Sequence, residues 1–352
     1  MKRISQLPII ILLLLLASCG STHEVAVNTM EPARVDLSDK IVRVGILNSA
    51  GQLEEANLGK GIDRLVAIEN QWLIKKGQDA ALFGLMDELI KDNRFDVQLL
   101  DSSIAGLEGF SDNSEAISWV SIKSICEKYK IDALFHLTHF DAETQISLRK
   151  TKMEHLNMLR EKEEISAQEI TLETFIQNGW RIYDPFLEKI VDEYTYDQQI
   201  VSKAKGLDPV AALRAIGSRK DSILSTGEFA GNSYGERLKP YERKIYRTYF
   251  VKGTDNLVQA GKNMASGDVQ AAIQLWQEET GHPKTKIKGR ACYNLAVGKE
   301  LEGDLAQALA WATKANQSLN DKNSRNYVAE LESRMNQQNI VEAQLAQLNF
   351  YD

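Results

Sequence analysis

Cysteine is scarce in this sequence, and its cysteines are far apart. Cys126 lies in an apolar helical pattern, and Cys292 lies between Ala291 and Tyr293. A disulfide framework needs closely spaced cysteine pairs, whereas isolated cysteines in apolar surroundings behave as small hydrophobic residues. We therefore expect Cys126 and Cys292 to be buried and unbridged, and the third cysteine, Cys19, to have a different role.

The sequence also lacks the motifs of common enzymes and nucleotide-binding proteins. Gly59-Lys60-Gly61 matches neither the P-loop nor the dinucleotide fingerprint, and no Gly-x-Ser-x-Gly elbow occurs. The carboxylates from Glu161 to Glu164 form a charge run, which is typical of a solvated surface. We find no catalytic constellation and no cofactor motif, so we predict a non-enzymatic protein without a cofactor.

Histidines with metal-ligand spacing are missing as well. His136 and His139 flank Leu137-Thr138 near the end of a predicted strand. On a regular strand, positions three apart point to opposite faces, so the two rings would share a metal only if the strand ended between them. Neither has a cysteine or a second histidine pair nearby, which favours a structural role and predicts no metal site.

Basic residues are outnumbered in this chain. It has 42 Lys and Arg against 49 Asp and Glu, for a formal net charge of −7. Nucleic-acid affinity depends on basic patches, so we expect no nucleic-acid partner. After residue 19, no apolar run reaches the roughly 20 residues that span a bilayer, and we expect that part of the chain to be soluble.

The first residues read as a bacterial lipoprotein signal. Lys2 and Arg3 precede an apolar run over Leu7–Ala17, and the run ends in Leu16-Ala17-Ser18-Cys19. A basic start, a short apolar core and small residues before the cut are typical of a secretory signal. A cysteine directly after the cut supplies the thiol that receives lipid. We therefore predict a signal peptide over 1–18 and a membrane anchor on Cys19.

The first half of the mature chain alternates between strand and helix patterns. Strands are predicted over 41–47, 95–100 and 133–138, with helical periodicity over 78–92 and 114–129 between them. The order strand, helix, strand, helix, strand predicts right-handed crossovers and a parallel core.

The pattern changes after the third strand. Apolar and polar residues alternate in three further segments, 144–148, 170–183 and 190–200. With a turn at Asp184-Pro185, this predicts an antiparallel hairpin added to the parallel strands, one face of which is in solvent. The charged segment 150–168 is expected to be a short helix or a loop. Residues 39–205 are therefore predicted to form an α/β domain with a mixed sheet in the order β-α-β-α-β-β-β.

The flanking segments show weaker patterns. Residues 19–38 are polar and lack a period, so they are predicted to be a lipidated tether. Residues 206–252 are predicted to be a helical connector, in which Gly227–Gly235 forms a turn. Pro240 is expected to open a helix, because proline suits the first helical turn. This helix would carry Arg243 and Arg247 on one face.

A repeat occurs in the last part of the chain, residues 253–352. Four features recur at an offset of 36 residues, namely Ala260, Gly267-Asp268, Ala272-Ile273 and Trp276, echoed by Ala296, Gly303-Asp304, Ala308-Leu309 and Ala312. The offset is close to the tetratricopeptide period of 34 residues. Small alanines let antiparallel helices approach closely, and Gly-Asp turns the chain between them. We predict an all-α, tetratricopeptide-like domain of helical hairpins.

Aromatic and basic residues gather in two stretches of the sequence. Tyr and Arg are enriched at binding hot spots. The candidate binding surface consists of Trp180, Arg181, Tyr183, Tyr234, Arg237, Arg243 and Arg247. The same residue types also serve internal packing, and we favour the interpretation that the aromatics hold the sheet against the helical domain while the arginines pair with local acids.

Several short motifs occur together along the chain: Leu16-Ala17-Ser18-Cys19, Glu31-Pro32-Ala33, Val44–Asn48, Trp180–Pro185 and Gly231–Gly235 with Pro240 and Arg247. In this combination the sequence resembles a family of Bacteroidota lipoproteins that share a domain of unknown function and end in tetratricopeptide-like helices. The resemblance implies a Gram-negative envelope and the outer membrane. No acidic run follows Cys19, which favours a position facing the periplasm.

Two functional hypotheses follow. The first is a membrane-anchored envelope lipoprotein that acts as a non-enzymatic protein-binding or assembly scaffold, with its helical repeats contacting an envelope protein. The second is an α/β lipoprotein that binds a small ligand or glycan. Its crevice would lie beyond the carboxyl ends of the first and third strands, around Asn48, Ser49 and Thr138.

Overall fold

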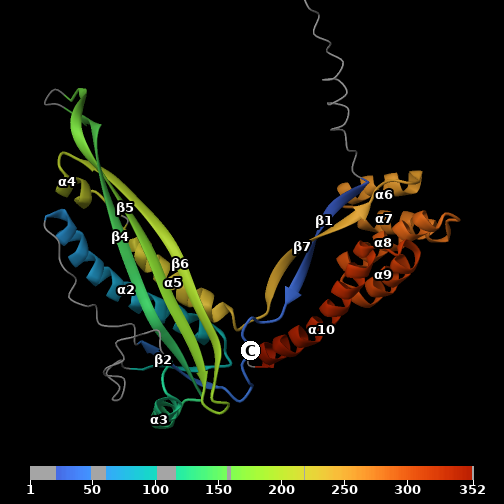
Figure 1. The fold of residues 1–352 in the computed structure, drawn as a ribbon, viewed down its shortest axis with the longest axis horizontal. Coiled ribbons are helices and arrows are strands. Elements are labelled where there is room, and N and C mark those ends of the chain that lie inside the picture. The colour runs from blue at the N-terminus through green and yellow to red at the C-terminus, as the bar shows by residue number, and fades with distance from the viewer. Residues whose placement is uncertain (1–20, 49–60, 101–115, 157–159, 218, 351–352) are drawn as a thin grey trace, which may run out of the picture. The chain divides into compact units, whose positions relative to one another are not determined.

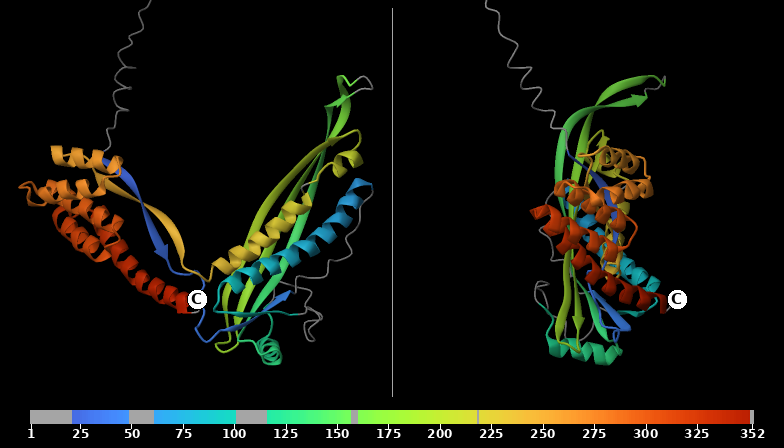
Figure 2. Two further views of the ribbon diagram at one scale, coloured as in Figure 1. Left: turned by 180° about the vertical axis from the view of Figure 1, so that it is seen from behind. Right: turned by 90° about the vertical axis from the view of Figure 1, so that its right-hand side faces the viewer.

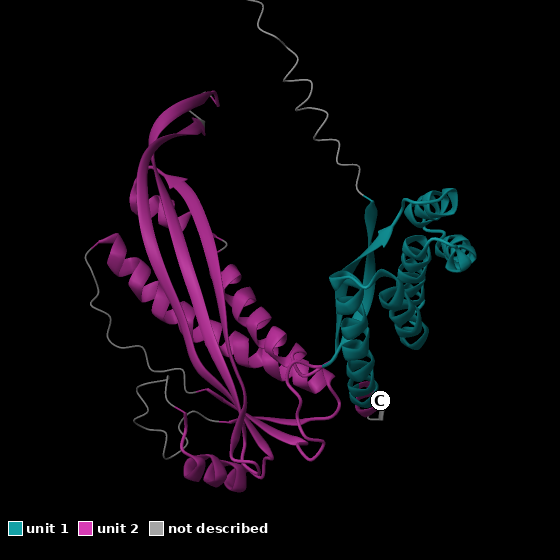
Figure 3. Cartoon of the chain, turned by 45° about the vertical axis from the view of Figure 1, so that its right-hand side comes forward, with its two compact units in different colours: residues 1–32, 240–344 teal, residues 33–239, 345–352 magenta. Residues whose placement is uncertain are grey.

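The computed structural model describes residues 21–48, 61–100, 116–156, 160–217 and 219–350 (Figure 1). Cys19 and Ser49 therefore lie outside the described residues. The chain divides into two compact units, coloured separately in Figure 3. One comprises residues 33–239 with 345–352 and is called the α/β unit here. The other comprises residues 1–32 with 240–344 and is called the helical unit.

The α/β unit contains a five-stranded sheet in the order β3-β2-β4-β5-β6. Its strands are β2 (Arg43–Asn48), β3 (Asp96–Leu100), β4 (Ala133–Leu156), β5 (Lys162–Asp184) and β6 (Lys189–Gly206). β2 pairs in parallel with β3 and β4, while β5 pairs antiparallel with both β4 and β6. The predicted parallel core with an added antiparallel hairpin is thus confirmed, as is the turn at Asp184-Pro185.

Helices cover the two faces of this sheet unequally. α2 (Ile62–Lys91) and α5 (Arg219–Glu236) run side by side along one face (Figures 1 and 2). Their side chains share a core with alternate residues of the strands, such as Phe135 and Trp180. α3 (Trp119–Tyr129) packs on the opposite face near one end, against Leu134 and Tyr183. The short α4 (Pro209–Arg214) follows β6.

α2 and α5 are in backbone contact because both carry glycines at their crossing. A Cβ atom at Gly231 would lie 2.0 Å from the carbonyl oxygen of Ala81, and one at Gly84 would lie 2.3 Å from that of Glu228. The prediction that Gly227–Gly235 forms a turn is therefore wrong, since this stretch is helical. Glycine normally disfavours a helix by about 1 kcal/mol relative to alanine, and here the close packing of two helices requires it.

Residues 150–156 and 162–168 of the charged segment are strand, which corrects the prediction of a short helix or a loop over 150–168. They belong to β4 and β5, which pair antiparallel here. Ion pairs cross between the two strands, from Arg149 to Glu169 and from Lys152 to Glu164, each at 2.9 Å. Arg149 and Glu169 face each other, whereas Lys152 and Glu164 are diagonal neighbours. Opposite charges at both kinds of position stabilise a strand pair, so these charged residues fit exposed strands.

The helical unit begins with a two-stranded ribbon that the sequence did not predict. β1 (Thr22–Glu31) pairs antiparallel with β7 (Tyr241–Phe250), and Thr22 lies opposite Phe250. Half of the predicted tether over 19–38 is therefore strand, and the prediction of a helix after Pro240 is wrong as well. Each strand is stabilised by a partner more than 200 positions away, and a local pattern cannot reveal such pairing.

The other described helices of this unit are α6 (Asp255–Ala265), α7 (Val269–Glu278), α8 (Thr285–Leu301), α9 (Leu305–Leu319) and α10 (Lys322–Phe350), with a 3-10 turn η1 (Glu279–Gly281) after α7. α10 belongs to this unit as far as Gln344. α6 with α7 and α8 with α9 form two hairpins. In their turns, Gly267 and Gly303 adopt φ values of +85° and +80°. Such values favour glycine. Asp268 and Asp304 then cap the second helix of each hairpin.

The repeated small residues lie where the hairpins pack. Ala260, Ala272, Ala296 and Ala308 are fully buried, as is Trp276, and Ala312 is 1% exposed. Cys126 and Cys292 are buried and unbridged, as predicted. None of the described helices is long and apolar enough to cross a membrane.

Candidate functional site

The structure divides the seven residues of the candidate binding surface among several places. Three of them lie in the α/β unit on the face covered by α5. The Trp180 ring stacks on the Tyr234 ring with centroids 5.2 Å apart, and both side chains are 1% exposed. Arg237 lies over the Tyr194 ring and pairs with Asp192 at 2.9 Å. These residues hold the sheet against α5 within the α/β unit, which corrects the expectation that the aromatics hold it against the helical domain.

The remaining four residues do not join this stack. Tyr183 is fully buried on the other face of the sheet, where its hydroxyl accepts a hydrogen bond from the backbone N–H of Ile117. Arg181 lies on the same face as Tyr183. Arg243 and Arg247 belong to β7 in the helical unit, where Arg243 is exposed.

Arg247 is part of an internal ion cluster. It binds Glu300 at 2.9 Å and also pairs with Glu330. The Tyr327 hydroxyl donates to Glu300 at 2.7 Å, and Arg334 contacts the same carboxylate. Burial disfavours the charged guanidinium, but the bond to Glu300 outweighs this effect and raises the pKa of Arg247. Arg247 therefore fixes the ribbon to the helices.

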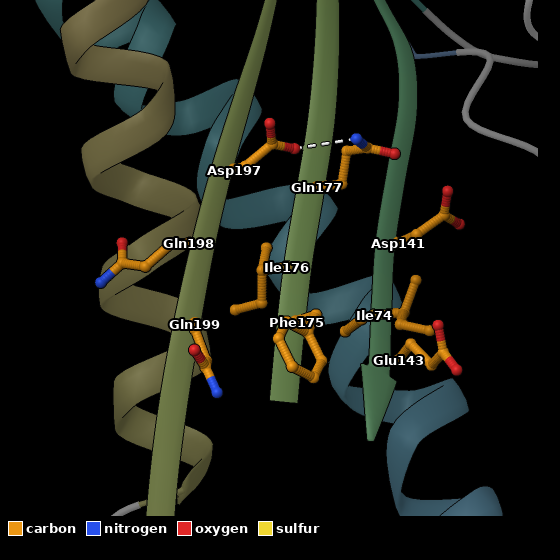
Figure 4. A pocket seen from close by; sticks show the side chains of 10 residues that line it. Ile74, Asp141, Glu143, Phe175, Ile176, Gln177, Asp197, Gln198 and Gln199 are labelled. Atoms are coloured by element: carbon orange, nitrogen blue, oxygen red, sulfur yellow. Dashed lines mark hydrogen bonds between the residues drawn. The ribbon is translucent and has the colours of Figure 1, made fainter. Parts of the chain in front are cut away.

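A different surface has the features of a binding site. Beyond the part covered by α3, no described helix covers the face of β4, β5 and β6 opposite α2 and α5, and Asp141, Phe175 and Asp197 are exposed there. This face holds a groove of about 790 Å³ (Figure 4). The groove is lined by Asp141, Glu143, Phe175, Gln177, Asp197, Gln198 and Gln199, together with three residues of the core, namely Ala142, Ile176 and Ile74 of α2. Polar side chains alternate there with core residues, which confirms the predicted solvent-facing side of the hairpin.

Each strand contributes side chains to this groove at every second position. Asp141 and Glu143 come from β4, Phe175 and Gln177 from β5, and Asp197 from β6. The Gln177 amide donates to Asp197 at 2.8 Å, and Figure 4 shows these two side chains pointing toward each other. The Phe175 ring is 39% exposed, which leaves part of its surface available to a ligand.

A second pocket of about 420 Å³ adjoins the groove and shares Asp141 and Gln177 with it. Arg181 lies in this pocket and donates to Glu193 at 2.8 Å. Burial opposes the charge of Arg181, yet the hydrogen bond to Glu193 raises its pKa. The Glu193 side chain is 58% exposed and the Arg181 side chain only 8%, so the carboxylate is the member of the pair that reaches the solvent.

A β-bulge places His139 in the second pocket. The pairing of β4 with β5 shifts between Leu137 and His139, so that His136 faces Arg181 and His139 faces Gly179. Both histidines consequently lie on the same face of the sheet, which corrects the expectation of opposite faces. A Cβ atom at Gly179 would lie 2.2 Å from the His139 ring, so glycine provides the room for it.

The two histidines differ in their surroundings. His136 is 2% exposed, and burial, with a smaller contribution from Arg181, lowers its pKa to about 3. Burial also lowers the pKa of His139, although Asp141 and Asp197 oppose the shift. The Nδ1 atom of His139 lies 3.0 Å from the Thr138 hydroxyl oxygen. Among the described residues, no group of three or more His, Cys, Asp or Glu is arranged to hold a metal ion.

The structure bears out only part of the crevice expected around Asn48, Ser49 and Thr138. Asn48 ends β2 opposite Leu137, and Thr138 lines the second pocket. The groove itself lies further along β4, β5 and β6, and sequence reasoning missed it. In the sequence, its signal was the alternation of polar residues over 141–145 and 173–177. This alternation predicted a solvent-exposed face of the sheet, but it could not distinguish a groove from ordinary surface.

The comparisons with known proteins give the following matches. Residues 258–336 match a family described as Domain of unknown function (DUF6340). No curated protein matches the chain. Ten solved chains match, among them a protein from Helicobacter pylori described as a neuraminyllactose-binding hemagglutinin homolog. It is 12% identical, with a TM-score of 0.24, over 57% of this chain and 91% of that chain. Residues 41–250, more than half of the sequence, match a family described as Domain of unknown function (DUF8603), and the chain belongs to this family.

Proposed function

We propose that this protein is a lipid-anchored, non-enzymatic binding protein of the bacterial envelope, and that the open face of β4, β5 and β6 binds its ligand. The anchor is supported by the Leu16-Ala17-Ser18-Cys19 motif. The resemblance to Bacteroidota lipoproteins supports the outer membrane and a periplasm-facing position. The observation that carries the binding role is the groove of about 790 Å³ on a sheet face that α2 and α5 leave bare.

The lining of the groove favours a hydroxyl-rich ligand such as a glycan. Asp141, Glu143 and Asp197 present carboxylates that accept hydrogen bonds, and Gln177 and Gln199 can both donate and accept. Ligand sites combine a few such polar groups with apolar surface, here the exposed ring of Phe175. A sugar offers hydroxyl donors to the carboxylates and an apolar ring face to the phenylalanine.

A glycan array probed with the mature chain tests this function. We expect binding to one glycan class. Phe175→Ala and Asp197→Asn should each raise the Kd about tenfold, which corresponds to a loss of about 1.4 kcal/mol of binding free energy. Val201→Ala is the matched control, because Val201 is an exposed apolar residue of β6 outside the groove. Binding that survives both groove substitutions, or no binding to any glycan, would overturn the glycan function.

The two hairpins of the helical unit favour a second candidate function, a protein-binding or assembly scaffold. Their turns and buried alanines repeat at 36 residues, which supports a tetratricopeptide-like array. β7 already covers part of α8: Asn294 exchanges two hydrogen bonds of 2.7 Å with the backbone of Phe250. A protein partner would therefore contact other faces, such as the exposed sides of α7 and α9.

Affinity purification from crosslinked, detergent-solubilised envelopes tests the scaffold. A stoichiometric protein partner that is lost with Cys19→Ala would support it. A preparation without a partner would leave the groove as the functional surface and exclude a stable scaffold.

A further inference from the structure

The proposed lipid anchor, Cys19, precedes one defined end of the ribbon in the sequence. The Ser21 carbonyl accepts a hydrogen bond of 3.0 Å from the Val251 N–H, and Thr22 pairs with Phe250. Cys19 precedes Ser21 by two residues. Two residues of extended chain span at most about 7 Å. A lipid on Cys19 therefore holds this end of the ribbon within a short distance of the membrane surface.

The amino end of α8 lies at this same end of the ribbon. β7 and α8 run antiparallel, because Arg247 binds Glu300 while Phe250 binds Asn294. Further along, a Cβ atom at Gly253 would lie 2.5 Å from the side chain of Ile287. The contacts thus progress from the carboxyl end of α8 to its first turn as β7 approaches the anchored end.

This end of α8 is basic in an otherwise acidic protein. Lys284, Lys286, Lys288 and Arg290 occur within seven positions, and residues 280–299 include no acid. The three lysines are exposed, and none of them forms an ion pair within the part of the chain that the structure describes. Arg290 donates to the Lys252 carbonyl at 2.7 Å, which holds this cluster beside the end of the ribbon. The positive end of the α8 dipole adds to the same potential.

We infer that this basic cluster, Lys284, Lys286, Lys288 and Arg290, contacts the anionic headgroups of the membrane in which the Cys19 lipid is inserted. The inference rests on the lipid anchor of the proposed function and not on the glycan groove. Lysines near an anionic surface each strengthen association about fivefold, and salt screens the attraction. The lipid alone would allow the helical unit to rotate about its anchor, whereas the cluster turns the amino end of α8 to the membrane.

Lysine labelling of the lipidated mature protein tests the contact. The protein is placed in nanodiscs of phosphatidylglycerol or of phosphatidylcholine and treated briefly with an acetylating reagent. Mass spectrometry then gives the labelling rate of each lysine. Lys244 is the matched control, because it is exposed on β7 six positions before Phe250. That spacing is about 20 Å along a strand.

We expect Lys284, Lys286 and Lys288 to be labelled about fivefold more slowly in the anionic discs, with the difference abolished at 0.5 M NaCl. Lys244 should be labelled equally in both. Equal rates for the three lysines in both discs, on protein whose intact mass shows the acyl chains, would overturn the inference and leave the anchor standing. An intact mass without acyl chains would instead overturn the anchor, and this inference with it.

Discussion

Glu300 shows how a single residue can join a ribbon to a helical stack. Its carboxylate is enclosed and held by Arg247, Tyr327 and Arg334. Removing one partner from a buried ion cluster leaves the other charges unpaired, which lowers the free energy of unfolding by about 3 kcal/mol. Glu300→Gln should therefore destabilise the helical unit by about 3 kcal/mol in urea unfolding.

The neighbouring exposed pair provides the control for this substitution. Glu302 binds Lys299 at 2.7 Å across one helical turn. Exposed pairs of this kind contribute about 0.5 kcal/mol, so Glu302→Gln should change the stability little. Equal effects of the two substitutions would show that the Glu300 cluster is not a major source of stability.

His136 should make the α/β unit sensitive to acid. Its pKa is lowered to about 3 in the folded protein, against an ordinary value of 6.5. Below pH 6.5 the unfolded chain binds a proton that the folded protein does not, so stability is lost as the pH falls from about 6.5 to about 3. Between pH 7 and pH 5 the loss should be about 2 kcal/mol.

His136→Phe tests this acid sensitivity, because phenylalanine fills a similar volume without titrating. The stability of the variant, measured by urea unfolding at pH 7 and pH 5, should fall by about 2 kcal/mol less than that of the wild type. The other titrating groups are common to both proteins and cancel in the difference. Parallel losses in the two proteins would exclude His136 as the acid-sensitive group.

At the scale of elements, the crossing of α2 and α5 depends on glycine. Gly231→Ala would place a Cβ atom 2.0 Å from the Ala81 carbonyl oxygen and 2.6 Å from the Leu85 nitrogen. Alanine gains about 1 kcal/mol in helix propensity, yet the helices must move apart, so we expect a net loss of about 2 kcal/mol in thermal unfolding. Gly281→Ala, whose Cβ would meet nothing within 4 Å, is the control. An unchanged Tm for Gly231→Ala would show that the helices separate easily.

The elements that sequence reasoning found are those fixed by local signals. The Gly-Asp turns at 267–268 and 303–304 carry their own backbone and capping chemistry, and the central strands have clear alternation or apolar runs. The ribbon of β1 and β7 has no such signal, since its stability comes from pairing across the chain. The glycines of α5 even point locally to a turn, and only the packing against α2 explains them.

The candidate groove likewise depends on contacts that the local sequence does not reveal. The alternation of polar and apolar residues in β5 predicts a solvent-exposed face. The position of His139, however, depends on a bulge in β4 and on the space above Gly179. Neither can be read from residue types. Of the seven aromatic and basic residues chosen from the sequence, five make internal contacts, because packing uses the same side chains as binding. The other two are Arg181, which lines the second pocket, and Arg243, which is exposed.

At the scale of the whole molecule, the two compact units have separate cores. Phe135, Trp180 and their neighbours form one, while Trp276, Leu295 and their neighbours form another. Cooperative unfolding follows such cores, so we expect two transitions in hydrogen exchange resolved by peptide. Glu300→Gln should speed exchange in α8 and leave β4 unchanged, and Gly231→Ala should do the reverse. If either substitution speeds exchange equally in both cores, the chain unfolds as one cooperative unit, and the division into two units has no energetic meaning.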